Sequence, residues 1–367
     1  MADFIVGAVE YLSKFIFFII AVLVISPVLT WVERKQSAVM QDRIGANRAE
    51  ILGLRMLGLF HALADSLKLF TKEYFVPKGA DRLIFHLAPC ISIFFAVMGF
   101  AVIPHADTLI ISGQPVEMQI VNLNIGLLYF FAVLGMAVYG VVLGAWASNN
   151  NYALLGGLRA SAQMISYEVS IGISLVGIIL VYQSVDLMEI TRAQGDLLFG
   201  FLPKWGIFLQ PLAFFIFMAA GIAETKRIPF DAPEGESEIV GYFIEYSGMG
   251  FGMYFLTDFL ETILIACLTV TFFLGGWQAP FIDGWILQTF SDSTFLGIFQ
   301  LNNFILTIVQ FLAFVFKVCL VIFMMMTIRW TLPRFRYDQI MNLGWKMLLP
   351  LSLFNIVVTA IIVYFIG

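Results

Sequence analysis

Runs of about 20 apolar residues recur along the whole chain, and they constrain its fold more than any other feature. Only helices and closed barrels satisfy their own backbone hydrogen bonds within lipid, and uninterrupted apolar runs favour helices. Of the 367 residues, 60% are hydrophobic and 12% are charged. Soluble domains typically have about twice that charged fraction. The sequence therefore predicts an all-α membrane protein and argues against a soluble globular one.

The apolar runs predict about eight spanning helices. They cover approximately residues 15–32, 83–103, 120–146, 160–183, 205–224, 254–276, 304–328 and 347–366. No composition shift, low-complexity tract or internal repeat divides the chain, so we expect residues 1–367 to form a single polytopic membrane domain. No cleavable signal is evident, because the apolar run after Lys14 continues past Pro27 as a first span.

A further helix is predicted in the first connection, at residues 53–74. Its apolar residues recur at spacings of three and four, which indicates an amphipathic helix along the membrane surface or along the protein's flank. Asp65 and Lys68 lie on a polar face of this helix. The spacing favours an ordinary surface ion pair between them. The alternative is that both side chains line a cavity beneath the helix.

Lys and Arg are distributed unevenly between the connections. Of the 20 such residues, sixteen fall in the alternate segments 33–82, 147–159, 225–253 and 329–346. By the positive-inside rule these segments face the cytoplasm or the matrix, and both chain termini are predicted to lie on the outer side.

Four charged residues lie within the predicted spans, away from their terminal residues, where charge is costly and marks candidate functional sites. Glu168 lies in the fourth span, Asp258 and Glu261 share a face near the start of the sixth, and Lys317 is near the middle of the seventh. For Glu168 the favoured interpretation is a proton relay. For Lys317, a relay and a structural pair with one of the carboxylates are equally compatible with the sequence.

The connection after the fifth span is unusually acidic. A helix that begins near Pro233 would use Asp231 as its cap, with Glu234 three residues on. Capping does not require so many carboxylates, and their mutual repulsion makes the segment a candidate site for accepting and donating protons. The acidic residues here and at the end of the preceding span are Glu224, Asp231, Glu234, Glu236, Glu238 and Glu245.

The cysteines and histidines do not form a recognisable metal site. Cys90, Cys267 and Cys319 lie singly in apolar runs, which favours packing over iron–sulfur or metal ligation. Only His86 among the three histidines falls inside a span, so a pair of axial haem ligands is not expected. The sequence predicts no redox centre in this chain.

Several motifs, taken in order, resemble one known family over almost the whole chain. In composition and spacing they are similar to a membrane component of proton-pumping NADH:quinone oxidoreductase (respiratory complex I), namely NADH dehydrogenase subunit 1, which is called the H subunit in bacteria. The motifs include Trp31-Val-Glu-Arg-Lys35, Ala64-Asp-Ser-Leu-Lys68, Ser166-Tyr-Glu168, Pro229-Phe-Asp231, Glu234-Gly-Glu-Ser-Glu238 and Phe335-Arg-Tyr-Asp-Gln339.

The resemblance implies an eight-helix subunit that is not catalytic alone. With its neighbours it would form a cavity that admits quinone (ubiquinone or menaquinone) from the bilayer, and it would link quinone reduction by NADH to proton translocation. FMN and iron–sulfur clusters are expected in partner subunits. Those partners would be the peripheral quinone-site and cluster subunits, small membrane subunits and antiporter-like subunits, with lipid around them and no nucleic acid. A bacterial inner membrane is favoured over a mitochondrial one.

The resemblance also assigns residues, position by position. It places Arg34, Asp65, Lys68, Arg227, Phe230 and Asp231 in segments that form the quinone cavity or lead to it. It places Glu168, Glu224, Glu234, Glu236, Glu238 and Glu245 in an acidic proton path, to which Asp258 and Glu261 are added.

The chain departs from the family pattern at three places. Gly135 occupies a position where many bacterial relatives carry a Glu, so the predicted path lacks that acid. Asp258 stands where Glu is usual, and Glu261 nearby is expected to compensate. The loop at residues 45–57 is longer than the pattern and its register differs.

Two other functions fit parts of the sequence. The related membrane subunit of a proton-pumping membrane-bound hydrogenase would have the same fold without quinone, but the quinone-side motifs argue against it. A stand-alone ion-coupled transporter would be expected to have paired broken helices and internal repeats, and neither is visible in the sequence.

Overall fold

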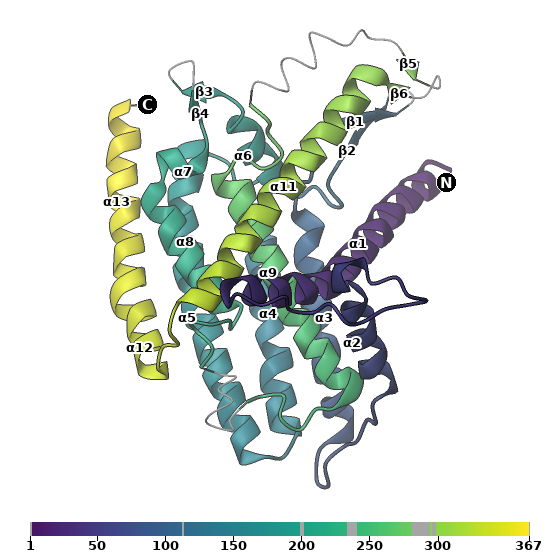
Figure 1. The fold of residues 1–367 in the computed structure, drawn as a ribbon. Coiled ribbons are helices and arrows are strands. Elements are labelled where there is room, and N and C mark those ends of the chain that lie inside the picture. The colour runs from purple at the N-terminus through teal and green to yellow at the C-terminus, as the bar shows by residue number, and fades with distance from the viewer. Residues whose placement is uncertain are drawn as a thin grey trace.

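The computed structural model describes residues 2–111, 114–198, 202–232, 241–280, 294–295 and 299–366. In these ranges helices dominate and the strands are short, which confirms the predicted all-α membrane fold. The helices gather into a bundle in which α9 (Gly248–Phe273) runs through the middle (Figure 1). Helix α13 (Leu349–Ile366) runs along one edge.

Seven helical segments in the described residues are long and apolar enough to cross a membrane. By residue range these are Lys14–Met40, Arg82–Val102, Gly126–Ala147, Asn151–Tyr182, Gly248–Phe273, Asn303–Thr331 and Tyr337–Phe365. They belong to α1 (Ala2–Met40), α3 (Arg82–Met98) with η2 (Gly99–Val102), α4 (Gly126–Ala147), α5 (Asn151–Tyr182), α9, α11 (Leu301–Thr331), and α12 (Tyr337–Asn342) continued through the π-helix η4 (Leu343–Leu348) into α13.

The predicted span at 205–224 is interrupted. It consists of α7 (Gly206–Leu209) and the 14-residue α8 (Pro211–Glu224), separated at Gln210. Helix α8 is roughly 21 Å long, shorter than the hydrocarbon core of a bilayer. The Gln210 side chain donates to Thr359 Oγ1 at 2.7 Å and accepts from Asn355 at 2.8 Å, so α13 supplies polar partners at the break. An eighth span built from α7 and α8 stays a prediction.

Helix α9 is the most enclosed of the candidate spans. In its most apolar window 89% of the residues are buried, against 22% for the segment Tyr337–Phe365. Helices α1, α3, α8 and α11 all contact α9. Charged side chains on α9 therefore lie inside the protein and need protein partners rather than lipid or bulk water.

The amphipathic helix of the first connection is α2 (Phe60–Thr71), preceded by the short η1 (Met56–Gly58). It is shorter than the predicted range 53–74 because Gly58 has a φ of +87°, which suits glycine, and because Lys72 is extended. The loop before it is anchored by His61, whose Nε2 accepts the backbone N–H groups of Arg48 and Ala49. Helix α2 packs against α1 and α9.

A small antiparallel sheet lies near one end of the bundle (Figure 1). Its strand order is β2-β1-β6-β5, and β3 pairs with β4 in a separate two-stranded hairpin. The bounds are β1 (Thr108–Ile111), β2 (Gln114–Glu117), β3 (Leu197–Leu198), β4 (Leu202–Pro203), β5 (Thr294–Phe295) and β6 (Phe299–Gln300), with the short helix α6 (Leu187–Ala193) between β2 and β3 in the chain.

His105 precedes β1 and is buried, with its ring edge-on to Phe314 at 5.6 Å. Burial lowers the pKa of His105 to about 4, so its imidazole is neutral at physiological pH. The neutral imidazole ring of His105 packs against Phe314 of α11.

Candidate functional site

A cavity of about 340 Å³ lies between α1, α2 and α9. Its lining is largely apolar, with a few polar groups from α1 and α2, as is typical of small-molecule sites. The residues around it are Leu23, Ser26, Pro27, Thr30, Ala62, Asp65, Ser66, Leu69, Phe70, Met249, Gly252, Phe255, Leu256 and Phe259. The three helices that line it are the first long apolar helix, the amphipathic helix and the central helix of the bundle.

Three residues predicted for this region meet beside the cavity. Arg34 pairs with Asp65 at 2.6 Å, and Lys68 contacts the other oxygen of Asp65 at 3.5 Å. The predicted ion pair between Asp65 and Lys68 is therefore confirmed. Asp65 also lines the cavity and Lys68 is not among its lining residues, so the alternative interpretation holds for Asp65 alone. The side chains are partly exposed, and the ion pairs by themselves contribute little to stability.

Phe259 separates the cavity from a buried cluster of charges. The guanidinium of Arg227 lies over the Phe259 ring at 4.0 Å, and its Nη1 contacts Glu33 Oε2 at 3.2 Å. Arg329 contacts the other Glu33 oxygen at 2.6 Å. Sequence reasoning singled out Arg227 but not the other three. Only Glu33 had a signal, since it lies inside the Trp31–Lys35 motif.

The segment that follows Arg227 is held against α5. The Gln163 side chain donates to the carbonyls of Ala223 and Phe230 at 2.8 and 2.7 Å. The Phe230 ring packs between Tyr167, at 5.8 Å, and Phe335, at 5.5 Å. Phe230 is thus a buried packing residue of this segment, and Gln163 is a positioning residue that the sequence analysis missed.

Asp231, the last of the predicted quinone-side residues, lines a second, smaller cavity of about 40 Å³. This volume is large enough to hold water. The cavity joins the two groups of predicted residues, because Arg227 and Asp231 share it with Asp258. Its full lining is Thr225, Lys226, Arg227, Ile228, Asp231, Phe255, Asp258 and Arg329.

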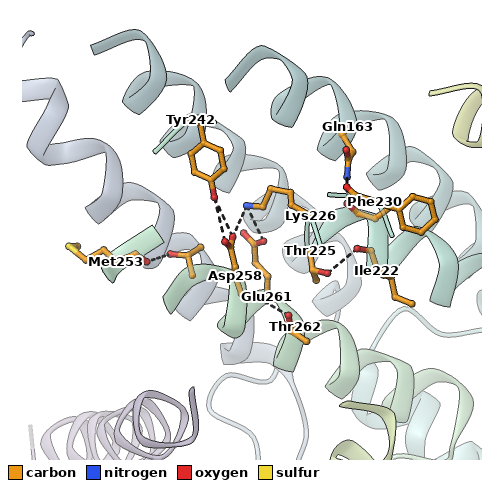
Figure 2. A network of polar contacts seen from close by, with 12 residues as sticks. Gln163, Ile222, Thr225, Lys226, Phe230, Tyr242, Met253, Asp258, Glu261 and Thr262 are labelled. Atoms are coloured by element: carbon orange, nitrogen blue, oxygen red, sulfur yellow. Dashed lines mark hydrogen bonds and ion pairs between the residues drawn. The ribbon is translucent and has the colours of Figure 1, made fainter. Parts of the chain in front are cut away.

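Asp258 and Glu261 face a buried lysine that the sequence analysis did not select. Lys226 Nζ lies 2.9 Å from Asp258 Oδ1 and 3.5 Å from Glu261 Oε2 (Figure 2). The Tyr242 hydroxyl lies 3.5 Å from both oxygens of Asp258. Lys226 was overlooked because it follows a helix end in sequence, where a lysine is normally solvated, whereas here it is 2% exposed.

Glu224 is the most enclosed of the predicted acids. It is 0% exposed, and in the part of the chain that the structure describes neither carboxyl oxygen has a hydrogen-bond partner. Electrostatic interactions connect it to Glu261, Glu168 and Lys226. The structure thus brings Glu224 into one electrostatic group with three other ionisable residues.

Glu168 lies against Gly135 of the preceding helix, α4. A Cβ built on Gly135 would stand 2.9 Å from Glu168 Oε1. This is closer than real Cβ contacts, so the carboxyl of Glu168 occupies the space that a side chain at position 135 would take. Because Gly135 of α4 has no side chain, it leaves room for the Glu168 carboxyl group of α5.

Replacing Gly135 by alanine is expected to displace the Glu168 carboxyl and to lower coupled quinone reductase activity by about two- to fivefold, with assembly retained. The activity is measured in membranes as NADH-driven quinone reduction with accompanying acidification. The matched control is Gly172→Ala, whose added Cβ would meet only Phe131 at 3.9 Å. Equal effects of the two substitutions would show that the contact with Glu168 is not responsible.

The remaining predicted acids lie elsewhere. Glu245 accepts a hydrogen bond from the side chain of Asn150, the residue that caps the N-terminus of α5. The predicted helix start near Pro233 also falls outside the described residues, so the capping role of Asp231 stays a prediction. The acids Glu234, Glu236 and Glu238 lie outside the described residues as well.

Lys317 is held by backbone carbonyls just after the C-terminal end of α9. Its ammonium donates to the oxygens of Leu274, Gly276 and Gln278 at 2.8, 3.0 and 2.7 Å, and it lies over the Trp205 ring at 4.6 Å. These contacts support the structural interpretation of Lys317. Among the described residues, these partners are carbonyl oxygens and not the intramembrane carboxylates that the sequence offered.

Within the described ranges, no group of three or more His, Cys, Asp and Glu is arranged to hold a metal ion. Cys90, Cys267 and Cys319 are free thiols. His86 is engaged by Tyr74, whose hydroxyl lies 3.0 Å from Nδ1.

Comparison with known proteins identifies the family of this chain. The family model for NADH dehydrogenase matches residues 13–360. This chain belongs to that family. Its relatives include the NADH-quinone oxidoreductase H subunit 1 of Cytophaga hutchinsonii, 41% identical over 96% of this chain and 97% of the relative.

Two further relatives are also NADH-quinone oxidoreductase H subunits and are similar over most of their length. The NADH-quinone oxidoreductase H subunit 1 of Geobacter metallireducens is 44% identical, with 95% of each chain covered. The corresponding protein of Thermomicrobium roseum is 44% identical over 91% of this chain and 90% of the relative. As a member of the NADH dehydrogenase family, the chain is one component of an oxidoreductase and is not catalytic alone.

Proposed function

We propose that this chain forms the quinone-access cavity of a proton-translocating NADH:quinone oxidoreductase and links quinone reduction to proton movement. The observation that carries the proposal is the cavity between α1, α2 and α9, which leads to Phe259 and, behind it, to Arg227. A mostly apolar cavity of this size suits a quinone ring with part of its isoprenoid tail.

The charged residues around the two cavities have distinct roles in this proposal. Arg34, Asp65 and Lys68 lie beside the α1–α2–α9 cavity and orient the quinone head group as it arrives from the bilayer. Arg227, held by Glu33, presents a guanidinium that stabilises negative charge as the quinone is reduced. Asp231 lines the adjoining small cavity, and Phe230 packs behind this segment and fixes its position.

The acidic residues form the proposed route for protons. The route includes Asp258 beside the small cavity, then Glu261, Glu224 and Glu168, which are electrostatically connected. Charge that develops on the quinone next to Arg227 would act on the Lys226–Asp258 ion pair and, through it, on the protonation of Glu261. Glu245, Glu234, Glu236 and Glu238 extend the acidic route in this proposal.

The proposal also names what the chain works with. The quinone is ubiquinone or menaquinone, and electrons come from FMN and iron–sulfur clusters in peripheral partner subunits. Small membrane subunits and antiporter-like subunits would cover the exposed apolar helix faces together with lipid. We place the protein in a bacterial inner membrane, with both termini outside and residues 225–253 on the cytoplasmic side, because of the distribution of Lys and Arg.

The test is NADH-dependent reduction of ubiquinone and of menaquinone in membranes that lack this chain, before and after the chain is restored. We expect quinone reduction only after restoration, together with sensitivity to inhibitors that occupy quinone cavities. Reduction of an artificial acceptor that bypasses the membrane serves as the control for the peripheral subunits. Quinone reduction that is unchanged by loss of the chain would contradict the proposal.

A further inference from the structure

The buried cluster around Lys226 contains one cation and two carboxylates. Lys226 comes from the segment after α8, and Asp258 and Glu261 come from one face of α9 (Figure 2). Each of the three residues is at most 7% exposed. A buried charge without a counter-charge is strongly disfavoured, and one ammonium balances only one of the two carboxylates. The cluster therefore needs a proton to be fully neutralised.

The two carboxylates are not equivalent. Asp258 is the nearer to the ammonium, at 2.9 Å against 3.5 Å for Glu261, and only Asp258 is also within reach of the Tyr242 hydroxyl. Glu261 Oε2 has only the longer 3.5 Å contact with Lys226 Nζ, and in the described part of the chain this atom makes no closer hydrogen bond. Both extra contacts stabilise the charged form of Asp258 more than that of Glu261.

The backbone conformation of Lys226 indicates that contacts with its neighbours hold this residue in place. Lys226 has a φ of +54°, in the left-handed region that residues other than glycine rarely adopt. This conformation lets the side chain extend toward α9, where its ammonium also lies 5.4 Å from the centre of the Tyr242 ring. A strained residue that persists in the interior is held there by its contacts.

We propose that Lys226 is the permanent counter-ion of Asp258 and that Glu261 is the carboxyl group of this cluster that gains and loses the proton. The proposal rests on the proposed function, because it assigns roles within the same proton route. Lys226 is a positioning residue: its charge keeps Asp258 ionised, so that only Glu261 changes protonation state.

The movement of the proton follows from the neighbours of each group. When Glu261 takes up a proton, its O–H bond forms at the carboxylate and the cluster changes from a net charge of −1 to neutral. On release, the proton passes to Glu224, which interacts electrostatically with Glu261. The other ionisable groups near the cluster in the described residues include Arg227, Asp231 and Arg329 in the small cavity, together with Glu224, Tyr242 and Tyr254.

The experiment compares two double variants in the intact complex in membrane vesicles, with proton translocation measured per quinone reduced. Lys226→Met alone leaves two uncompensated carboxylates and is expected to lower translocation about fivefold or more. Lys226→Met with Asp258→Asn removes the ion pair but keeps Glu261, so translocation should return to within about twofold of the unmodified complex. Lys226→Met with Glu261→Gln is the matched control and should stay low.

The proposal is overturned if the two double variants behave alike, or if the variant that retains Glu261 is no better than Lys226→Met. Should the double variants fail to assemble, Glu261→Gln alone decides, since it leaves the Lys226–Asp258 pair intact. It must lose translocation, and normal translocation would refute the assignment. Glu224→Gln distinguishes failure of the proposed proton route from failure of the roles assigned to Lys226, Asp258 and Glu261. If it also translocates protons normally, the proposed route fails as a whole, whereas loss in Glu224→Gln without the expected pattern at Lys226 refutes only this inference.

Discussion

Replacing Arg227 by alanine is expected to lower NADH-driven quinone reduction by about tenfold or more, with assembly retained. Arg227 stacks on Phe259, which lines the access cavity, and its guanidinium pairs with Glu33. Its removal takes away a cation that stacks on a lining residue of the cavity. Glu33 keeps Arg329 at 2.6 Å, so the substitution does not leave a buried carboxylate without a partner.

The measurement is the ratio of quinone reduction to artificial-acceptor reduction in membranes. Arg227→Lys is an informative comparison because lysine keeps the charge but loses the planar group that stacks on the ring, and we expect intermediate activity. Arg192→Ala is the matched control, since its pair with Asp107 is partly exposed and contributes little. Equal losses in both assays for Arg227→Ala would indicate an assembly defect rather than a role at the quinone.

Replacing Glu224 by glutamine is expected to abolish most proton translocation, by about tenfold or more, with little loss of assembly. Glu224 is fully buried, and its carboxyl oxygens have no hydrogen-bond partner in the part of the chain that the structure describes. Glutamine has nearly the same shape as a protonated carboxyl group but cannot exchange a proton. Vesicle acidification per quinone reduced measures the effect.

Glu224→Asp is the control for the second prediction. It keeps an exchangeable carboxyl group one methylene shorter, so part of the translocation should be retained. Glu189→Gln tests specificity, because Glu189 is an exposed acid of α6 that pairs with Ser184. If Glu224→Gln translocates protons as well as the unmodified complex, Glu224 does not belong to the route.

Site residues that lie within one motif or one helical turn of each other could be predicted from the sequence. Arg34 lies in a recognisable motif, and Asp65 and Lys68 lie one turn apart on an amphipathic helix, so their pairing followed from helical spacing. The intramembrane acids Glu168, Asp258 and Glu261 were identified because charge in an apolar run is rare and costly.

Partners that come from distant segments were missed. Lys226 was not selected, although it is the buried counter-charge of Asp258, because its backbone conformation and burial have no signature in sequence. Gln163 and Arg329 were missed for a related reason, since each contacts a segment far away in the chain. For Lys317 the sequence offered carboxylates, whereas its ammonium donates to carbonyl groups exposed where α9 ends.

By itself the sequence determined the class of the protein and the positions of most of its charges. Apolar runs long enough to cross a bilayer favour a helical bundle, because unpaired backbone groups are costly in lipid. Charged residues inside such runs are so rare that each one can be recognised in the sequence as a candidate functional residue. Only the tertiary structure decided which charge meets which. Ion pairs, cavities and the space left by Gly135 depend on how helices pack against each other, and that packing is set by contacts between segments far apart in the chain.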